Sequence, residues 1–370
     1  MKNEYGARVN PWQLILLING CQVGTGIFQI GRMADKSHAA WISVILAASV
    51  PILALWLIRQ ALKDYHDENL PELAYRIFGK KAGLLLLVIY ILSELIITAA
   101  VLRMQLELVS MNLLARTPIQ VVAMVTMLTA FLIVNKGILA ITRLNELLFY
   151  LSVILLYFFI SPLCHEAQLT NLLPLTEVEW GESVKDALSL ALLYGGTGVL
   201  FIWYPLLQEK EKMFSRSVIG VMMTMGAYLY LLIGCLLVYG ADMMEYMLWP
   251  VLSLLKIVPN YLIQRSDFFV LGLWLGIGMR PIINFLFTAT ECASRLRKKS
   301  DEQYQKSFFW INACFCVVVW AMVLIPQNIV EGFMYIKLLS LYGACIGILF
   351  PLIFWIGGMI HAKKQQTTPC

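Results

Sequence analysis

Charged residues are scarce in this chain of 370 residues: Asp, Glu, Lys and Arg make up only 14% of it, whereas 60% is hydrophobic. Soluble globular proteins average about 25% charged and roughly 45–50% apolar residues. The net charge of +5 does not indicate a nucleic-acid partner, because the basic residues lie in short loops between apolar runs. The composition excludes a soluble domain and predicts a protein embedded in a membrane.

Histidine is rare as well, and the cysteines form no CxxC pair. The four histidines lie in loops or at helix ends, where they assemble no metal site and no catalytic triad. Most of the eight cysteines fall within apolar runs, and we interpret them as small buried hydrophobic residues. Without a nucleophile, base or metal constellation, we expect neither an enzyme nor a bound metal or cofactor. No A-x-A-like cleavage site follows the long first apolar run, so we expect no signal peptide.

Long apolar runs fill most of the chain. A helix that crosses a bilayer needs about 20 predominantly apolar residues. The candidate spans are Pro11–Gly31, Ala39–Leu62, Gly83–Leu114, Pro118–Val134, Leu144–Leu163, Val184–Leu207, Val218–Tyr239, Phe268–Ala293, Phe308–Ile325 and Lys337–Met359. We therefore predict an all-α membrane protein of about ten transmembrane helices, with residues 1–370 as a single integral domain surrounded by lipid.

Lysine and arginine are unevenly divided between the loops on the two sides of these spans. One side holds 19 of them and the other holds 7. Because cytoplasmic loops carry the excess of basic residues, both termini are predicted to lie in the cytoplasm.

The same Gly-Thr-Gly-aliphatic string occurs in the first and the sixth predicted spans, 172 positions apart. Each string lies mid-span in the first helix of a five-helix half, and an odd number of spans makes the two halves begin on opposite sides. This is the pattern of a 5+5 inverted repeat of the LeuT or APC type, whose interrupted helices form the substrate site. We predict repeats at residues 11–163 and 184–359, with broken first and sixth helices.

Each string predicts a helix break that exposes backbone groups at mid-membrane. Glycine costs about 1 kcal/mol in a helix interior relative to alanine. The free N–H groups of the second half-helix favour an anion, and the free carbonyls of the first favour a cation, so a zwitterionic amino acid fits both. The alternative is that the glycines only pack helices closely. The candidate ligand-binding residues are Gly24, Thr25, Gly26, Ile27, Phe28, Gly196, Thr197, Gly198, Phe201 and Trp203.

Glu94, Arg103, Glu107 and Arg280 are charged residues inside predicted spans, where charges are costly and usually functional. Arg103 and Glu107 are four residues apart on one helix face, which favours a structural ion pair over ligand contact. Glu94 and Arg280 lie deeper, in equivalent helices of the two halves. For these two, mutual pairing and a role in the site remain equal alternatives.

Longer strings resemble those of a known family. They are Gly24-Thr25-Gly26-Ile27, Arg116-Thr117-Pro118-Ile119-Gln120-Val121, Trp249-Pro250 with Ser253-Leu254, and Arg265-Ser266-Asp267-Phe268-Phe269, with Glu107 nine residues before Arg116. With these strings, the chain resembles the B subunit of spore germination receptors, a branch of the amino acid–polyamine–organocation transporter superfamily.

The resemblance implies a ligand-sensing subunit in the inner membrane of the dormant spore. It would bind a small-molecule nutrient, often an amino acid, and work with A and C subunits of the receptor. A secondary amino acid transporter is the alternative, because both share one fold.

The charge asymmetry yields a prediction about topology. The cysteine of Lys298→Cys should not react with an impermeant thiol reagent applied from outside, because the basic loops lie in the cytoplasm. The cysteine of Glu179→Cys should react, because its loop lies on the outer side. Labelling of single-cysteine variants measures this, and reaction at position 298 alone would reverse the orientation.

Overall fold

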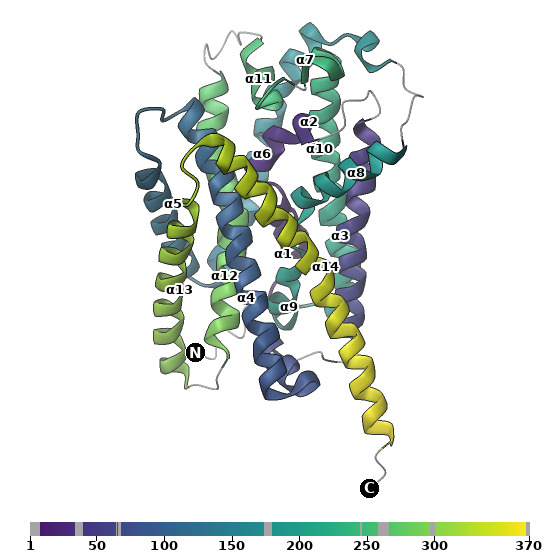
Figure 1. Cartoon of the computed structure of the whole chain (residues 1–370), viewed down its shortest axis with the longest axis vertical. Helices are drawn as coiled ribbons and strands as arrows, with labels where there is room; N and C mark the ends of the chain where they lie inside the picture. The colour runs from purple at the N-terminus through teal and green to yellow at the C-terminus, as the bar shows by residue number, and fades with distance from the viewer. Residues whose placement is uncertain are drawn as a thin grey trace.

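The structure is a computed structural model of the chain, and it describes residues 8–33, 40–63, 65, 68–173, 180–244, 246–257, 266–296 and 300–367. Positions 179, 265 and 298, which the sequence analysis used, lie outside these ranges. The described residues are almost entirely helical (Figure 1). Their one β-bridge is parallel: the Val9 N–H donates to the Leu206 carbonyl at 2.9 Å, and the Gln208 N–H donates to the Val9 carbonyl at 3.0 Å. The chain before the first helix is thereby joined to the end of the sixth span.

The first half of the chain contains the first five spans. Its helices, with 3₁₀ helices written η, are α1 (Pro11–Gln22), η1 (Thr25–Gln29), α2 (Ile30–Met33), α3 (Ala40–Leu62), α4 (Leu70–Asn112), α5 (Ile119–Val134), α6 (Ile138–Leu156), η2 (Tyr157–Phe159), α7 (Ile160–Glu166) and η3 (Leu169–Leu172).

The second half contains the other five. Its helices are α8 (Trp180–Leu190), η4 (Ala191–Tyr194), η5 (Thr197–Val199), α9 (Leu200–Trp203), η6 (Tyr204–Leu206), η7 (Lys210–Lys212), α10 (Met213–Met244), α11 (Pro250–Ile257), α12 (Ser266–Ser294), α13 (Asp301–Val323) and α14 (Ile329–Thr367).

Seven of the described helical stretches are long and apolar enough, by length and composition, to cross a membrane, and α5 is a shorter apolar helix. The remaining two predicted spans, the first and the sixth, are each divided into short helical pieces. The number and order of the predicted spans agree with this arrangement. The third is longer than predicted, because α4 begins at Leu70 and bends at Gly79, where φ is 76°.

Local sequence signals fix where helices begin. The Asn10 side chain accepts a hydrogen bond from the Gln13 N–H at 2.8 Å, and the Gln13 side chain accepts one from the Asn10 N–H at 3.2 Å, with Pro11 at the first helical position. Such capping boxes satisfy N–H groups that have no partner inside the helix. Ser300 and Gln303 form the same box at the start of α13.

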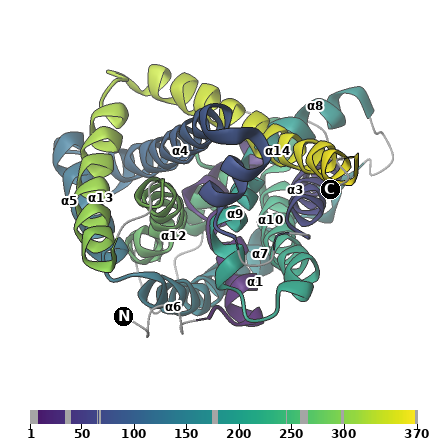
Figure 2. The same cartoon turned by 90° about the horizontal axis from the view of Figure 1, so that it is seen from below.

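Helix α12 is the central element. Within its most apolar stretch 72% of the residues are buried, against 22–50% in the other six membrane-length helices. It contacts α1, α4, α6, α9 and α13. Seen from the end of the molecule where α1 begins, α12 and α9 lie inside a ring of longer helices (Figure 2). Both breaks are thus held against α12, which contacts α1 and η1 of the first span and η5 and α9 of the sixth.

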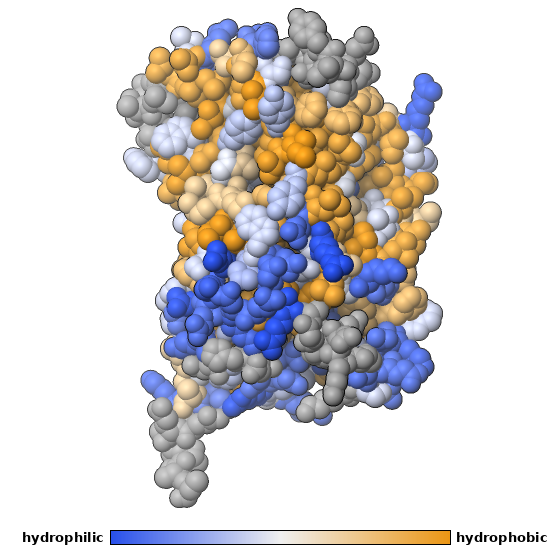
Figure 3. All heavy atoms as spheres, turned by 180° about the vertical axis from the view of Figure 1, so that it is seen from behind, coloured by the Kyte–Doolittle hydropathy of each residue, from blue (hydrophilic) through white to orange (hydrophobic). Residues whose placement is uncertain are grey.

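The outer surface matches a membrane environment. Large apolar side chains on α5, α13 and α14 are well exposed, including Leu128, Val317 and Leu338. The space-filling view shows apolar residues over most of the height of the molecule (Figure 3). Hydrophilic residues gather at the end where α1 begins and α14 ends (Figure 3). The chain is an integral multi-pass membrane protein.

The ion pair predicted from the spacing of Arg103 and Glu107 is present. The Arg103 Nε donates to Glu107 Oε1 at 2.8 Å, and both side chains are nearly inaccessible. The Arg103 Nη1 also donates to the carbonyls of Val323 at 2.8 Å and Pro326 at 3.3 Å, just after α13. The pair therefore fastens α4 to the connection between α13 and α14.

Breaking this pair should destabilise the protein strongly. Replacement of one partner, as in Arg103→Leu, leaves a buried charge without its counter-charge, at a cost of roughly 3–5 kcal/mol in the free energy of unfolding. Denaturation of the purified protein in detergent measures this. Lys306→Ala, which breaks an exposed pair with Glu302, is the matched control and should cost at most about 1 kcal/mol. Strict additivity in the double variant Arg103→Leu/Glu107→Leu would show that the two residues act independently.

Candidate functional site

The first span breaks where the Gly-Thr-Gly string predicts. Helix α1 ends at Gln22, because Val23 (φ −85°, ψ 94°) and Gly24 (φ −128°, ψ −151°) are extended before η1 begins at Thr25. A Cβ on Gly24 would lie 3.0 Å from Pro281 Cγ. The bare backbone therefore lets the break approach α12 closely.

The sixth span breaks at Gly196, for two reasons that both require glycine. Its φ of 100° lies in the left-handed region, which glycine adopts without the Cβ penalty. A Cβ there would also lie 2.8 Å from Cys21 Cβ and from the Phe285 ring. Helix α8 ends at Leu190 and is followed directly by η4, and the next helical segment, η5, begins after Gly196. The second predicted break is also present.

A cavity of about 70 Å³, here called the central cavity, lies between the two breaks. Helices α4, α12 and α14 complete its wall with mostly apolar side chains. Its lining consists of Cys21, Gln22, Gly24, Thr25 and Gly26 from the first break, Leu193 and Gly195 from the sixth, and Ile97, Ala100, Val101, Met104, Pro281, Phe285 and Ile336. One face is therefore polar backbone, and the opposite face is a set of aliphatic and aromatic side chains.

A smaller cavity of about 20 Å³, the acidic cavity, is lined by Glu94, Tyr90, Gly196 and Gly198, together with residues of α14. Ile97 lines both cavities. Glu94 is only 3% exposed, and its Oε2 has no hydrogen-bond partner among the described residues. A Cβ on Gly198 would lie 3.5 Å from Glu94 Oε1. A buried carboxylate therefore faces the bare backbone of the sixth span.

Side-chain donors hold the carbonyls freed by the two breaks. The Tyr228 hydroxyl of α10 lies 2.8 Å from the Gln22 carbonyl and 3.2 Å from the Leu193 carbonyl, so it bridges both breaks. The Trp274 Nε1 of α12 donates to the Gly24 carbonyl at 3.3 Å. The Tyr90 hydroxyl of α4 donates to the Gly198 carbonyl at 2.9 Å. Unwound backbone at membrane depth persists only with such partners.

Glu94 and Arg280 form no ion pair with each other. The Arg280 Nη1 donates to Asn19 Oδ1 and its Nη2 to the Val23 carbonyl, both at 3.3 Å. Arg280 is 1% exposed, and no described acid lies within ion-pair distance of it. The two deep charges therefore serve different places: Glu94 borders the acidic cavity, and Arg280 braces the first break.

The remaining candidate residues lie outside the two cavities. Phe28 is buried against Trp274, with ring centroids 5.1 Å apart. Phe201 packs against rings of α14, and Trp203 is fully buried. Neither Ile27 nor Thr197 borders either cavity, although both are buried. That these residues contact a ligand stays a prediction.

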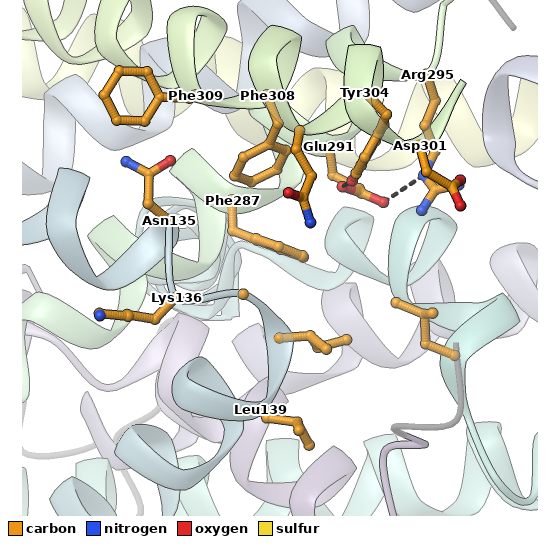
Figure 4. A pocket seen from close by; sticks show the side chains of 14 residues that line it. Asn135, Lys136, Leu139, Phe287, Glu291, Arg295, Asp301, Tyr304, Phe308 and Phe309 are labelled. Carbon is orange, nitrogen blue, oxygen red and sulfur yellow. Dashed lines mark hydrogen bonds and ion pairs between the residues drawn. The ribbon is translucent and has the colours of Figure 1, made fainter. Parts of the chain in front are cut away.

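A third cavity, of about 340 Å³, lies at the α9 end of the molecule between the α5–α6 connection, α12 and α13 (Figure 4). Its polar wall contains Glu291, whose carboxylate accepts hydrogen bonds from Arg295 and Tyr304 (Figure 4). Helix α9 runs from the acidic cavity toward this one, and its Trp203 packs against Phe287, with centroids 5.3 Å apart. Phe287 lines the third cavity, so this ring contact joins α9 to the wall of that cavity.

Solved structures share this arrangement of helices. A Na+-coupled sialic acid symporter in its substrate-bound outward-open state matches 93% of this chain and 80% of its own length, with a TM-score of 0.67 and 12% identity. MhsT in complex with L-phenylalanine matches 92% and 88%, with a TM-score of 0.63 and 15% identity. The chain therefore has the LeuT-type transporter fold, and the predicted fold class is confirmed.

The sequence comparisons identify the protein family within this fold. Residues 8–332 match the Spore_permease family, described as "Spore germination protein". The putative spore germination protein YfkT of Bacillus subtilis is 24% identical over 90% of this chain and 91% of its own length. Spore germination protein B2 of the same organism is 22% identical over 95% of each. This chain belongs to the spore germination permease family, which is not a family of enzymes, and the resemblance seen in the sequence is confirmed.

Tyr228, Trp274 and Tyr90 are site residues that the sequence analysis missed. Each lies in a long apolar run, where an aromatic residue is indistinguishable from an ordinary core residue. Tyr228 follows the first break by more than 200 residues, so no local pattern links its hydroxyl to the Gln22 carbonyl. Asparagine or glutamine inside a span is a visible signal, whereas a single hydroxyl on an aromatic ring is not.

Removal of the bridging hydroxyl should loosen both breaks. Tyr228→Phe leaves two buried carbonyls without this donor, which should cost about 1–3 kcal/mol in the free energy of unfolding. Tyr230→Phe is a suitable control, because its hydroxyl lies 3.3 Å from the Leu156 carbonyl, away from both breaks. Denaturation in detergent compares the two variants, and an equal loss for both would show that the bridge contributes nothing special.

Proposed function

We propose that this chain is the nutrient-sensing B subunit of a spore germination receptor and binds its germinant, an amino acid, between the two broken helices. It would act in the spore inner membrane with A and C subunits, with both termini in the cytoplasm. Relatives described as spore germination proteins B2 and A2 cover 95% and 98% of the chain, which supports the receptor context.

The observation that carries the proposal is the partnerless carboxylate oxygen of Glu94. A buried charge is stable only with a partner, and a primary ammonium group offers three donors to a carboxylate. Glu94 lies against Gly198 and next to Ile97, which also borders the central cavity. A ligand ammonium group near Ile97 would supply the missing partner.

The other end of an amino acid suits the first break. Thr25 and Gly26 border the central cavity, and they begin a continuous helical segment over residues 25–33 that has no side-chain cap. Uncapped N–H groups at the start of a helical segment favour a carboxylate. The small volume and the aliphatic wall of Val101, Met104 and Ile336 favour a ligand of few heavy atoms with a small apolar side chain.

Neutralising Glu94 should weaken the response to germinant. Glu94→Gln removes one charge-assisted hydrogen bond, worth about 1.5–3 kcal/mol, which corresponds to a roughly 10- to 100-fold higher half-maximal germinant concentration. The measurement is a germination dose–response series in spores that carry each variant at matched abundance. Glu302→Gln, an exposed residue at the start of α13, is the control and should respond normally. A normal response of Glu94→Gln would contradict an amine site at this carboxylate.

Secondary amino acid transport is the second candidate, favoured by the third cavity. The sixth span borders the acidic cavity through Gly198 and the third cavity through Leu206, so a path along this span would connect them after a rearrangement of Trp203 and Phe287. Saturable uptake of a radiolabelled amino acid into proteoliposomes would favour the transporter, and binding without uptake would favour the sensor.

A further inference from the structure

The C-terminal end of a helix that stops inside a membrane protein attracts cations. Its last carbonyls have no intrahelical partner and carry the negative end of the helix dipole. In transporters built from broken helices, such carbonyls coordinate the coupling Na+ or proton. Helix α1 is a 12-residue helix that ends in this way at Gln22.

In this chain a guanidinium group stands at that position. The Arg280 Nη2 donates to the Val23 carbonyl, the first carbonyl beyond α1, and its Nη1 donates to Asn19 Oδ1. The Asn19 amide is oriented by a second bond, from its Nδ2 to Thr224 Oγ1 at 3.1 Å. That bond uses the donor side of the amide, so the acceptor side is presented to Arg280.

Among the described residues, no acid neutralises this guanidinium and no group bonds to its Nε. A fully buried cation of this kind costs much free energy unless its surroundings supply negative potential. Here that potential comes from the end of α1, the Val23 carbonyl and the Asn19 amide. These oxygens are ligands of the type that hard monovalent cations use.

We propose that the Arg280 guanidinium is a tethered cation that occupies the cation position at the first break. The protein therefore needs no dissociable Na+ or K+ to hold this break in its binding conformation. Only one consequence of this proposal rests on the proposed function, namely that germinant binding is independent of these ions. The occupancy of the position by Arg280 is a property of the fold itself.

Melting temperatures of the full-length protein in detergent, without germinant, test the occupancy. The wild type should melt at the same temperature in sodium, potassium and choline chloride at equal ionic strength. Arg280→Ala should melt about 5 °C lower in choline chloride. About 10 mM guanidinium, far below denaturing concentrations, should recover most of this loss in a saturable way by entering the vacated position. Arg143→Ala, an exposed arginine of α6, should match the wild type throughout.

Arg280→Gln separates the charge from the hydrogen bonds. If it melts like the wild type, the charge is not needed and the proposal fails. The proposal also fails if neither guanidinium nor Na+ raises the melting temperature of Arg280→Ala. Should Arg280→Ala not be purifiable, the wild type still decides, since a rise of about 2 °C or more in Na+ over choline means that a dissociable cation binds. None of these readouts involves germinant, so a misplaced ligand site would leave them unchanged.

Discussion

Hydrogen bonds from side chains to unwound carbonyls are the interaction on which the rest of this structure depends. In a membrane, a broken helix is stable only if protein groups replace the lost intrahelical partners. Tyr228, Trp274, Arg280 and Tyr90 do this from α10, α12 and α4. Each of these helices must therefore keep its register against the breaks. The central position of α12 follows, because two of the four donors stand on it within seven residues.

The sequence predicts what depends on local signals. Apolar runs give the spans, and the two Gly-Thr-Gly strings give the breaks, because glycine acts on its own backbone wherever it stands. The donors could not be predicted, since Tyr228 and Trp274 bond to carbonyls more than 200 residues away. The same limit explains Phe28 and Trp203, which follow the breaks in sequence but pack into the core. The local sequence therefore shows where a helix breaks. It does not show which side chains line the cavity beside the break, because these come from the distant helices α4, α12 and α14.

The free-energy cost of burying a charge is offset in three different ways in this structure. Arg103 has Glu107 as its counter-charge and fastens the connection after α13. Arg280 has only backbone and amide oxygens, so it serves the break beside it. Glu94 has one oxygen with no partner among the described residues and borders a cavity. A buried charge with fewer partners inside the protein is a stronger candidate for contact with a ligand. Glu94 is therefore the strongest candidate of the three.

The two faces of the central cavity have different stiffness, and this difference bears on selectivity. The backbone face is fixed by donors from α10 and α12, so it can hold the carboxylate end of an amino acid in one orientation. The side-chain wall includes Ile97, Met104 and Ile336, flexible side chains whose rotamers can change. A Cβ on Gly343 of α14 would lie 2.7 Å from Ile97, so α14 packs closely against a residue that lines both cavities. A larger ligand that displaces Ile97 would push it toward α14, which would link ligand size to the position of that helix.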